Sequence, residues 1–276
     1  MSAAYGLFGY PVHHSWSPFI HGMFARQTGQ DMTYRLFETP SERFRSDVLG
    51  FLSREGLGAN VTLPHKQAAA ELVNELTPRA QLADAVNTIV RRDDHLVGDN
   101  TDGAGLVADL TRNLGLSWRA PRVLLLGAGG AARGALAPLL GLAPATLVIA
   151  NRSGERARAL AAAFADHGPV RGCDFAGIGE ERFDLVVNAT SASLRGEVPP
   201  VPGTAVDATT TCYDMAYGVG DTPFVGWARA LGAAHAVQGW GMLVEQAAEA
   251  FELWRGIRPD TAPVLVALRS RAQAAP

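Results

Sequence analysis

A short glycine-rich segment directly after an apolar run constrains the fold of this chain more than any other feature. Residues 122–126, Arg-Val-Leu-Leu-Leu, have the pattern of a buried parallel strand. The segment 127–132, Gly-Ala-Gly-Gly-Ala-Ala, follows at once and leads into a helix toward Leu142. A strand, a Gly-x-Gly-x-x-Ala turn and a helix in this order are typical of a dinucleotide-binding unit, because the turn admits a pyrophosphate to the helix N-terminus. The alternative is a βα turn that is merely rich in glycine.

The rest of this region continues the alternation of strands and helices. Further strands are expected at residues 145–150, 185–188 and 209–214, with helical runs between them. Such alternation is typical of the α/β class and predicts a Rossmann-type, doubly wound parallel sheet.

The first hundred residues predict a second, smaller α/β domain that ends in a hairpin over residues 88–98. We expect a last, amphipathic helix with Glu245, Glu249 and Glu252 on its polar face. Its apolar face is expected to carry Leu243, Ala247, Ala250, Phe251 and Trp254. Because no strand follows that helix, we expect it to return to the first domain. The predicted domains are therefore 1–103 together with about 240–276, and 104–239.

The charge and the cysteine content of the chain limit which binding partners and metal sites are expected. The chain has 276 residues, 47% of them hydrophobic, and a formal net charge of −3. The small negative charge gives no electrostatic support for a nucleic acid or an anionic membrane, which leaves small molecules as the expected partners. Cys173 and Cys212 are too few for a disulfide framework or a metal cluster, so we expect no metal and a reducing, cytoplasmic location. No long apolar run or signal-like start is present.

Lys66 and Asp102 form a candidate acid-base pair. Pro64 is expected at the first position of a helix, which would put Lys66 in its first turn. The positive end of the helix dipole disfavours a charged lysine there, and this suits proton transfer. The alternatives are a solvated surface lysine and, for Asp102, the N-cap of a helix expected over residues 105–114.

Two hydroxyls, Ser15 and Ser17, stand just ahead of a helix start at Pro18. Free backbone N–H groups and the helix dipole favour an anion at such a place. Ser17 alone could be an ordinary N-cap.

The cofactor preference is set after the next strand of the glycine-rich domain. An NAD enzyme usually has an acidic residue there, whereas this chain has Asn151, Arg152 and Ser153, with Arg156 one turn later. A guanidinium binds a 2′-phosphate through two hydrogen bonds, so these residues favour NADP. The alternative is that the arginines form a solvated helix face.

Together these motifs resemble the shikimate dehydrogenase family over essentially the whole chain. The matching segments are 9–18, 60–66, 85–88, 100–103, 127–132, 151–152, 188–191, 213–217 and 241–248. The resemblance implies reversible reduction of 3-dehydroshikimate to shikimate with NADPH, on the route to the aromatic amino acids.

The resemblance also implies roles for individual residues. It assigns the substrate carboxylate to Ser15 and Ser17 with Tyr217 nearby, and makes Lys66 and Asp102 the catalytic pair. The ring hydroxyls are assigned to Asn60, Thr62, Asn87, Asp102 and Gln246. The cofactor is assigned to Gly127, Ala128, Gly129, Gly130, Ala131, Asn151, Arg152, Ser153, Arg156, Thr190, Gly239 and Met242.

Taken singly, several of these residues could have ordinary structural roles. Asn60 and Asn87 could be turn residues, and Gln246 a buried glutamine that bonds to backbone. The chain departs from the family pattern at Ser193 and Leu194, and Trp240 is unusual before Met242, which bears on cofactor positioning. Two alternatives to the shikimate dehydrogenase function remain. One is a quinate or aminoshikimate dehydrogenase, and the other is a non-catalytic metabolite-binding or regulatory relative. The expected oligomeric state is a monomer or homodimer.

Overall fold

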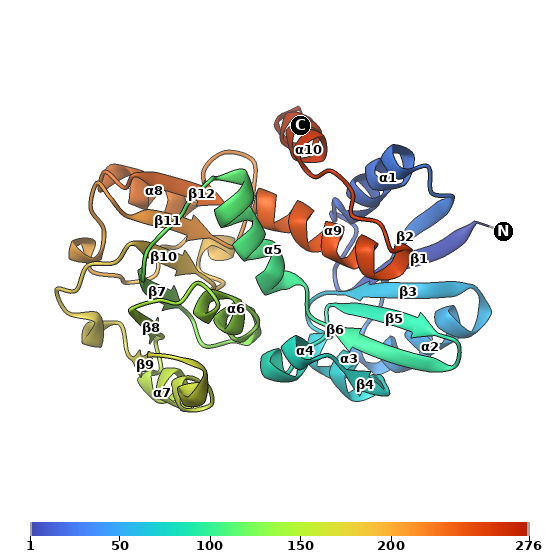
Figure 1. Ribbon diagram of the computed structural model, residues 1–276, viewed down its shortest axis with the longest axis horizontal. Coiled ribbons are helices and arrows are strands. Elements are labelled where there is room, and N and C mark those ends of the chain that lie inside the picture. Colours follow the sequence, from blue (N-terminus) through green and yellow to red (C-terminus); the bar gives the residue numbers. More distant parts are fainter. Residues whose placement is uncertain (1, 275–276) are drawn as a thin grey trace. The chain divides into compact units, whose positions relative to one another are not determined.

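A computed structural model describes residues 2–274 of the chain. The chain forms two compact units: residues 1–105 with 243–276, called the first unit, and residues 106–242, called the second unit. Each unit is built on a six-stranded sheet with helices packed against it (Figure 1). The α/β fold predicted from the sequence is confirmed.

The sheet of the first unit is mixed. Its strand order is β2-β1-β3-β5-β6-β4. The strands β1, β2 and β3 are parallel, whereas β5 runs antiparallel to both β3 and β6. The predicted hairpin is confirmed as the β5–β6 pair. The bounds are β1 (Ala3–Gly9), β2 (Met32–Glu38), β3 (Gly56–Val61), β4 (Glu75–Leu76), β5 (Thr88–Arg92) and β6 (His95–Asp99).

The helices of this unit are α1 (Ser17–Thr28), α2 (Phe44–Arg54) after the short turn η1 (Ser41–Arg43), α3 (Lys66–Leu72), α4 (Pro78–Ala83) and α10 (Ala262–Gln273). Two helices cross the boundary between the units: α5 (Asp102–Ala108), which continues as the π-helical turn η2 (Asp109–Asn113), and α9 (Trp240–Arg255). The expectation that α9 is the last helix is wrong, because α10 follows it. The helix expected over residues 105–114 begins three residues earlier, at Asp102.

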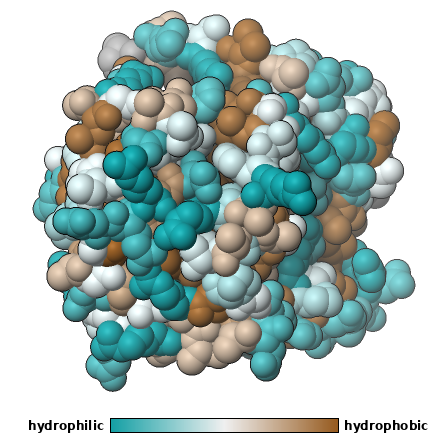
Figure 2. All heavy atoms as spheres, turned by 60° about the vertical axis from the view of Figure 1, so that its left-hand side comes forward, coloured by the Kyte–Doolittle hydropathy of each residue, from teal (hydrophilic) through white to brown (hydrophobic). Residues whose placement is uncertain are grey.

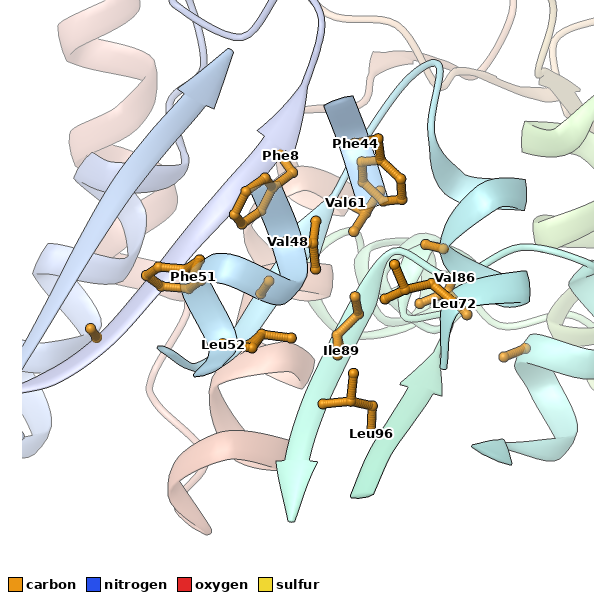
Figure 3. Packing of buried hydrophobic residues seen from close by; sticks show 14 residues of the cluster. Phe8, Phe44, Val48, Phe51, Leu52, Val61, Leu72, Val86, Ile89 and Leu96 are labelled. Carbon is orange, nitrogen blue, oxygen red and sulfur yellow. The ribbon is translucent and has the colours of Figure 1, made fainter. Parts of the chain in front are cut away.

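One apolar core of the first unit lies between its sheet and α2. Phe8 of β1 stacks on Phe37 at 4.5 Å and lies 5.7 Å from Phe51, measured between ring centroids. Figure 3 shows Val48 of α2 between Phe8 of β1 and Ile89 of β5, within one buried cluster. All seven residues of β1 are buried, as expected for a central parallel strand that is covered on both faces.

The second unit has an all-parallel sheet with the order β12-β11-β10-β7-β8-β9. The chain order reverses between β7 and β10, and ligands of such sheets bind beyond the carboxyl ends of the strands at this point. The strands are β7 (Arg122–Leu126), β8 (Thr146–Ala150), β9 (Val170–Cys173), β10 (Leu185–Asn188), β11 (Thr211–Asp214) and β12 (His235–Gln238). The helices are α6 (Gly130–Leu140), α7 (Gly154–Ala162) and α8 (Pro223–Ala230), with short turns η3 (Ala165–His167), η4 (Ala176–Ile178), η5 (Ser193–Arg195) and η6 (Gly203–Ala205).

The surface mixes hydrophilic and hydrophobic residues over the face drawn in Figure 2. Within residues 2–274, every helix is too short or too polar to cross a bilayer.

Candidate active site

The functional side chains of the first unit follow the ends of neighbouring strands. Ser15 and Ser17 follow β1, and Thr62 and Lys66 follow β3, which is parallel to β1. Asn87 stands just before β5, whose first residue pairs with Asn60 near the end of the antiparallel strand β3. The topology therefore gathers these side chains at one edge of the sheet.

Lys66 and Asp102 are in direct contact. The Lys66 Nζ atom lies 2.5 Å from Asp102 Oδ2, and the two side chains are only 25% and 16% exposed. The other carboxylate oxygen of Asp102 accepts a hydrogen bond of 2.9 Å from Asn87 Nδ2. The sequence-based alternatives, a solvated lysine and a helix N-cap, do not describe this geometry, because α5 begins at Asp102 itself and the carboxylate binds Lys66.

The prediction that Pro64 opens the helix is wrong. Pro64 lies in a turn that closes when the His65 backbone N–H donates to the Thr62 carbonyl at 3.0 Å. His65 is the N-cap, and Lys66 is the first residue of α3. Lys66 is therefore in the first turn of the helix as expected, but for a different local reason.

Ser15, and not Ser17, satisfies the start of α1. The N-cap residue is Trp16, which makes no side-chain capping bond, so the N-cap interpretation of Ser17 is wrong. The Ser15 Oγ atom accepts the Ser17 backbone N–H at 3.2 Å and donates to the Ser17 hydroxyl at 3.1 Å. The two hydroxyls therefore lie side by side at a helix N-terminus.

Asn60 and Asn87 are buried members of one polar network. Asn60 Nδ2 donates to the Asn87 carbonyl and to Thr88 Oγ1, both at 3.1 Å. Asn87 Nδ2 also donates to Thr101 Oγ1 at 2.9 Å, and its Oδ1 accepts the Thr101 backbone N–H at 2.8 Å. Both asparagines therefore link separate strands and loops, which is more than a local turn role requires.

Gln246 of α9 has contacts of both predicted kinds. Its Nε2 donates to the Leu243 carbonyl at 2.8 Å, as the backbone-bonded alternative requires. Its Oε1 faces Asn87 Nδ2 at 3.4 Å and Thr101 Oγ1 at 3.5 Å, which are long contacts. The amide thus lies beside the network around Asp102.

The predicted polar face of α9 needs a correction. Glu245 is only 1% exposed, because its carboxylate accepts hydrogen bonds from Arg258 at 2.9 Å and Thr261 at 2.6 Å. Both partners lie beyond the end of α9, in a segment to which the sequence pattern gave no role.

Tyr34 of β2 is a residue that sequence reasoning missed. Its hydroxyl donates to Asn60 Oδ1 at 2.8 Å. Its ring stacks on His21 of α1 with centroids 4.3 Å apart and planes 10° from parallel. The only sequence signal was its place on the more buried face of an alternating strand, where a tyrosine hydroxyl needs a partner.

The glycine-rich turn of the second unit fits a pyrophosphate. Gly127 has φ +107°, and a Cβ there would lie 3.2 Å from the Ala189 carbonyl oxygen, so the turn requires glycine. A Cβ at Gly129 or Gly130 would meet nothing within 4 Å, which leaves open space at the N-terminus of the eleven-residue helix α6. Free N–H groups facing such a space bind phosphate oxygens.

The remaining expected cofactor residues lie around the carboxyl ends of the same sheet. Ala128 is half-buried and Ala131 exposed in the turn, and the Thr190 methyl group would touch a Cβ at Gly127. Gly239 passes so close to the Met215 carbonyl that a Cβ would lie 2.5 Å from it.

Arg152 and Arg156 follow β8 and are exposed. Neither makes an ion pair with a carboxylate in the described part of the chain. Asn151 Nδ2 donates to the Ser153 carbonyl, and Ser153 is the N-cap of α7, with its Oγ accepting the Arg156 backbone N–H at 3.4 Å. The two guanidinium groups are free to bind an anion beside this helix start.

Tyr217 belongs to the second unit, on the loop after β11. Its ring packs against Trp240 with centroids 4.6 Å apart, and burial raises the pKa of its hydroxyl. Met242 is buried, and its backbone N–H donates to the Tyr213 hydroxyl at 3.3 Å. Tyr217, together with Ser193 and Leu194, lines a hollow of about 190 Å³.

Ser193, one of the departures from the family pattern, has a defined partner. Its Oγ donates to Asp214 Oδ2 at 2.5 Å, and Thr222 Oγ1 donates to the same oxygen at 2.7 Å. Burial raises the pKa of the Asp214 carboxyl, and these hydroxyls oppose the rise. Ser193 therefore ties its loop to the end of β11.

Three sequence-family models match the chain. Residues 7–89 match the shikimate dehydrogenase substrate binding domain. Residues 109–195 match shikimate / quinate 5-dehydrogenase, and residues 239–269 match the shikimate 5'-dehydrogenase C-terminal domain.

Individual relatives match over nearly the whole chain. The shikimate dehydrogenase (NADP(+)) of Aeromonas hydrophila subsp. hydrophila is 55% identical over 266 residues, which cover 96% of this chain and 97% of the relative. The crystal structure of an Ael1 enzyme from Pseudomonas putida is 46% identical, with a TM-score of 0.92 and coverage of 97% and 98% of the two chains. The shikimate 5-dehydrogenase of Thermus thermophilus, solved with NADP(H) and shikimate, is 33% identical, with a TM-score of 0.85 and coverage of 99% and 100%.

Proposed function

Because the chain belongs to the shikimate dehydrogenase family, we propose that it catalyses the reversible, NADP-dependent reduction of 3-dehydroshikimate to shikimate, on the route to the aromatic amino acids. The observation that carries the mechanism is the half-buried Lys66–Asp102 pair among amide and hydroxyl side chains. The first unit then serves as the substrate domain and the second as the NADP domain.

Lys66 is the proton donor in the reductive direction. NADPH, when bound, supplies the hydride that adds to the substrate's carbonyl carbon. The Lys66 ammonium gives a proton to the carbonyl oxygen, so that the product is a secondary alcohol and the lysine is left neutral. In the oxidative direction neutral Lys66 takes that proton back. Asp102 holds the ammonium at 2.5 Å and is itself held by Asn87.

The neighbouring side chains suit a trihydroxy acid. The paired hydroxyls of Ser15 and Ser17 at a helix start are suited to hold the carboxylate. The family resemblance adds Tyr217 as a further proposed contact. Thr62, Asn87 and Gln246 can hold the ring hydroxyls, because hydroxyl and amide groups both donate and accept.

The Asn60 amide has fewer free hydrogen-bonding positions for a substrate than the sequence suggested. Both of its N–H donors are engaged, and Tyr34 binds its oxygen, which leaves one acceptor position for a substrate hydroxyl.

The residues that would hold NADP lie in the second unit. The open turn of Gly127, Ala128, Gly129, Gly130 and Ala131 receives the pyrophosphate, and Arg152 and Arg156 receive the 2′-phosphate with Asn151 and Ser153. Thr190, Gly239 and Met242 remain proposed contacts of the cofactor, and the resemblance places the nicotinamide at Met242. A monomer or homodimer in the cytoplasm stays a prediction, which light scattering and cell fractionation would test.

A substrate panel tests the reaction. We expect NADP reduction with shikimate, and lower kcat/KM with quinate, with aminoshikimate and with NAD in place of NADP. Preference for quinate or aminoshikimate would reassign the substrate, and no turnover with any of them would refute the reaction.

Two substitutions at one position test the proton transfer. Lys66→Ala should lower kcat by about a hundredfold or more, and leave the shikimate KM within a few fold. The matched control is Lys66→Arg, which keeps the charge beside Asp102 but does not release a proton near neutral pH. If Lys66→Arg turns over at the wild-type rate, the lysine acts through its charge alone and the assignment is wrong.

A further inference from the structure

We propose that Tyr34 is a positioning residue for substrate binding, acting through Asn60 on the side chains around Asp102. The inference rests on the proposed function and adds a residue to it that makes no contact with the reacting atoms. It follows from a directed series of hydrogen bonds within the first unit.

The series begins at the tyrosine. The Tyr34 hydroxyl donates to Asn60 Oδ1 at 2.8 Å. This bond fixes which end of the Asn60 amide is oxygen and turns its Nδ2 toward the Asn87 carbonyl and Thr88 Oγ1. Without the hydroxyl, the buried amide oxygen loses its donor.

The same direction of donation continues to the catalytic carboxylate. Asn60 Nδ2 donates to Thr88 Oγ1 at 3.1 Å, and the Thr88 hydroxyl donates to Asn87 Oδ1 at 2.9 Å. Asn87 Nδ2 then donates to Asp102 Oδ1 at 2.9 Å. Because each group donates onward, every bond polarises the next, and the series behaves as one unit.

Tyr34 also has the Ser17 hydroxyl as a neighbour. Burial raises the pKa of the Tyr34 hydroxyl, and the Ser17 hydroxyl beside it opposes the rise. Ser17 is in turn bonded to Ser15 at 3.1 Å. The Tyr34 hydroxyl therefore has both Asn60, to which it donates, and Ser17 as polar neighbours.

The ring itself is packed against two other aromatic rings. It stacks on His21 at 4.3 Å and lies 6.4 Å from Trp254 between centroids. A phenylalanine can keep these contacts, so Tyr34→Phe removes the hydroxyl with little other change.

The test is steady-state kinetics and calorimetric shikimate binding on the full chain. For Tyr34→Phe we expect the shikimate KM and Kd to rise about tenfold, because one oriented hydrogen bond is lost. The NADP KM should stay within about twofold and kcat within about threefold, since Lys66 and Asn87 still hold Asp102.

Tyr5→Phe is the matched control. Tyr5 pairs with Tyr34 in the parallel β1–β2 register and packs on Trp254 at 4.6 Å. The described structure gives its hydroxyl no bond to a site residue. The control should behave as wild type in both KM values.

A double-mutant cycle with Asn60→Ala separates action through Asn60 from a general loss of packing. If Tyr34 acts through Asn60, the double variant binds shikimate within about twofold of Asn60→Ala alone. Additive effects, an equal rise in the NADP KM, or wild-type behaviour of Tyr34→Phe would each overturn the proposal.

Thr88→Val breaks the same series one bond further on, and decides the question if Tyr34→Phe does not fold. It should raise the shikimate KM selectively, and unchanged binding would count against the series. A wild-type protein that neither binds nor oxidises shikimate refutes the proposed function instead, which no result on Tyr34 alone does.

Discussion

His21 should make the first unit sensitive to acid. Its side chain is 1% exposed, and both ring nitrogens are buried with the Asn60 side chain as a polar neighbour. It is packed among the rings of Tyr34, Trp254, Phe24 and Phe251. Burial lowers the pKa of His21 from 6.5 to about 3, and the Asn60 amide opposes this only in part. The imidazole is therefore neutral in the native state throughout the range in which enzymes are assayed.

The sign and the size of the effect follow from this pKa. About one pH unit or more above 6.5 the imidazole is neutral in both the folded and the unfolded state, and pH has little effect on stability through it. As pH falls below 6.5, His21 binds a proton in the unfolded state but stays neutral in the folded state. The free energy of unfolding therefore decreases until pH reaches about 3. At pH 5, which is 1.5 pH units below the unfolded-state pKa, the loss at about 1.4 kcal/mol per unit is about 2 kcal/mol. Because pH 5 lies well above the folded-state pKa, this figure depends little on its value.

The assay compares His21→Phe with wild type. Urea unfolding at pH 8 and pH 5 gives the free energies, and hydrogen exchange of the β1 amides reports on the first unit alone. Between pH 8 and pH 5 the wild type should lose about 2 kcal/mol more than His21→Phe, whatever the variant's stability at pH 8. His235→Gln removes an exposed imidazole from β12 and should follow the wild type. Equal pH dependence of wild type and His21→Phe would refute the reasoning.

Three further outcomes are expected. Arg152→Glu should raise the NADP KM about tenfold or more and the NAD KM much less, because repulsion replaces a charge-assisted contact with the 2′-phosphate. Equal effects on the two KM values in parallel assays would refute the phosphate role. Arg79→Leu should lower the urea-unfolding free energy by about 3–5 kcal/mol, because it strips the bonds of 2.6 and 2.7 Å from Asp99, which is 4% exposed; a change below about 1 kcal/mol would contradict this. Ser193→Ala should lower it by about 1–2 kcal/mol by removing one of the hydroxyl donors to Asp214, and thermal melts that match wild type would show that the bond contributes nothing.

The parts that the sequence predicted are those determined by local pattern. The apolar run 122–126 and the glycine-rich turn after it predict a strand, a turn and a helix start within a dozen residues, and the structure has β7 and α6 there. Lys66 and Asp102 were recognisable because each lies in a distinctive short motif, and the topology then joins the two motifs.

Two of the failures involve partners distant in the chain. By its place in the sequence pattern Glu245 is expected to be an exposed helix residue. It is buried because Arg258, beyond the end of the helix, donates a hydrogen bond to its carboxylate. Tyr34 gives no local sign that its partner is Asn60, which is 26 residues away on a different strand. A burial pattern predicts which face of a strand is covered, but not which side chain covers it.

The start of α3 shows a different limit. Proline at a first helical position is a common arrangement, but Pro64 here lies in the preceding turn and His65 occupies the N-cap. The N-cap alternative for Ser17 is wrong for a similar reason, since the neighbouring Ser15 supplies the acceptor. Capping depends on backbone angles that neighbouring residue types do not determine.

The ion pair between Lys66 and Asp102 involves the only lysine among the 276 residues, whereas the chain has 23 arginines. Arginine guanidinium groups remain charged throughout the accessible pH range, so every other long basic side chain is silent in a titration. A sample labelled with lysine carrying ¹⁵N at Nζ would therefore give a single side-chain ammonium or amine resonance. The acid that the proposed reaction depends on can thus be followed by magnetic resonance in the unmodified enzyme, with no mutation needed for assignment.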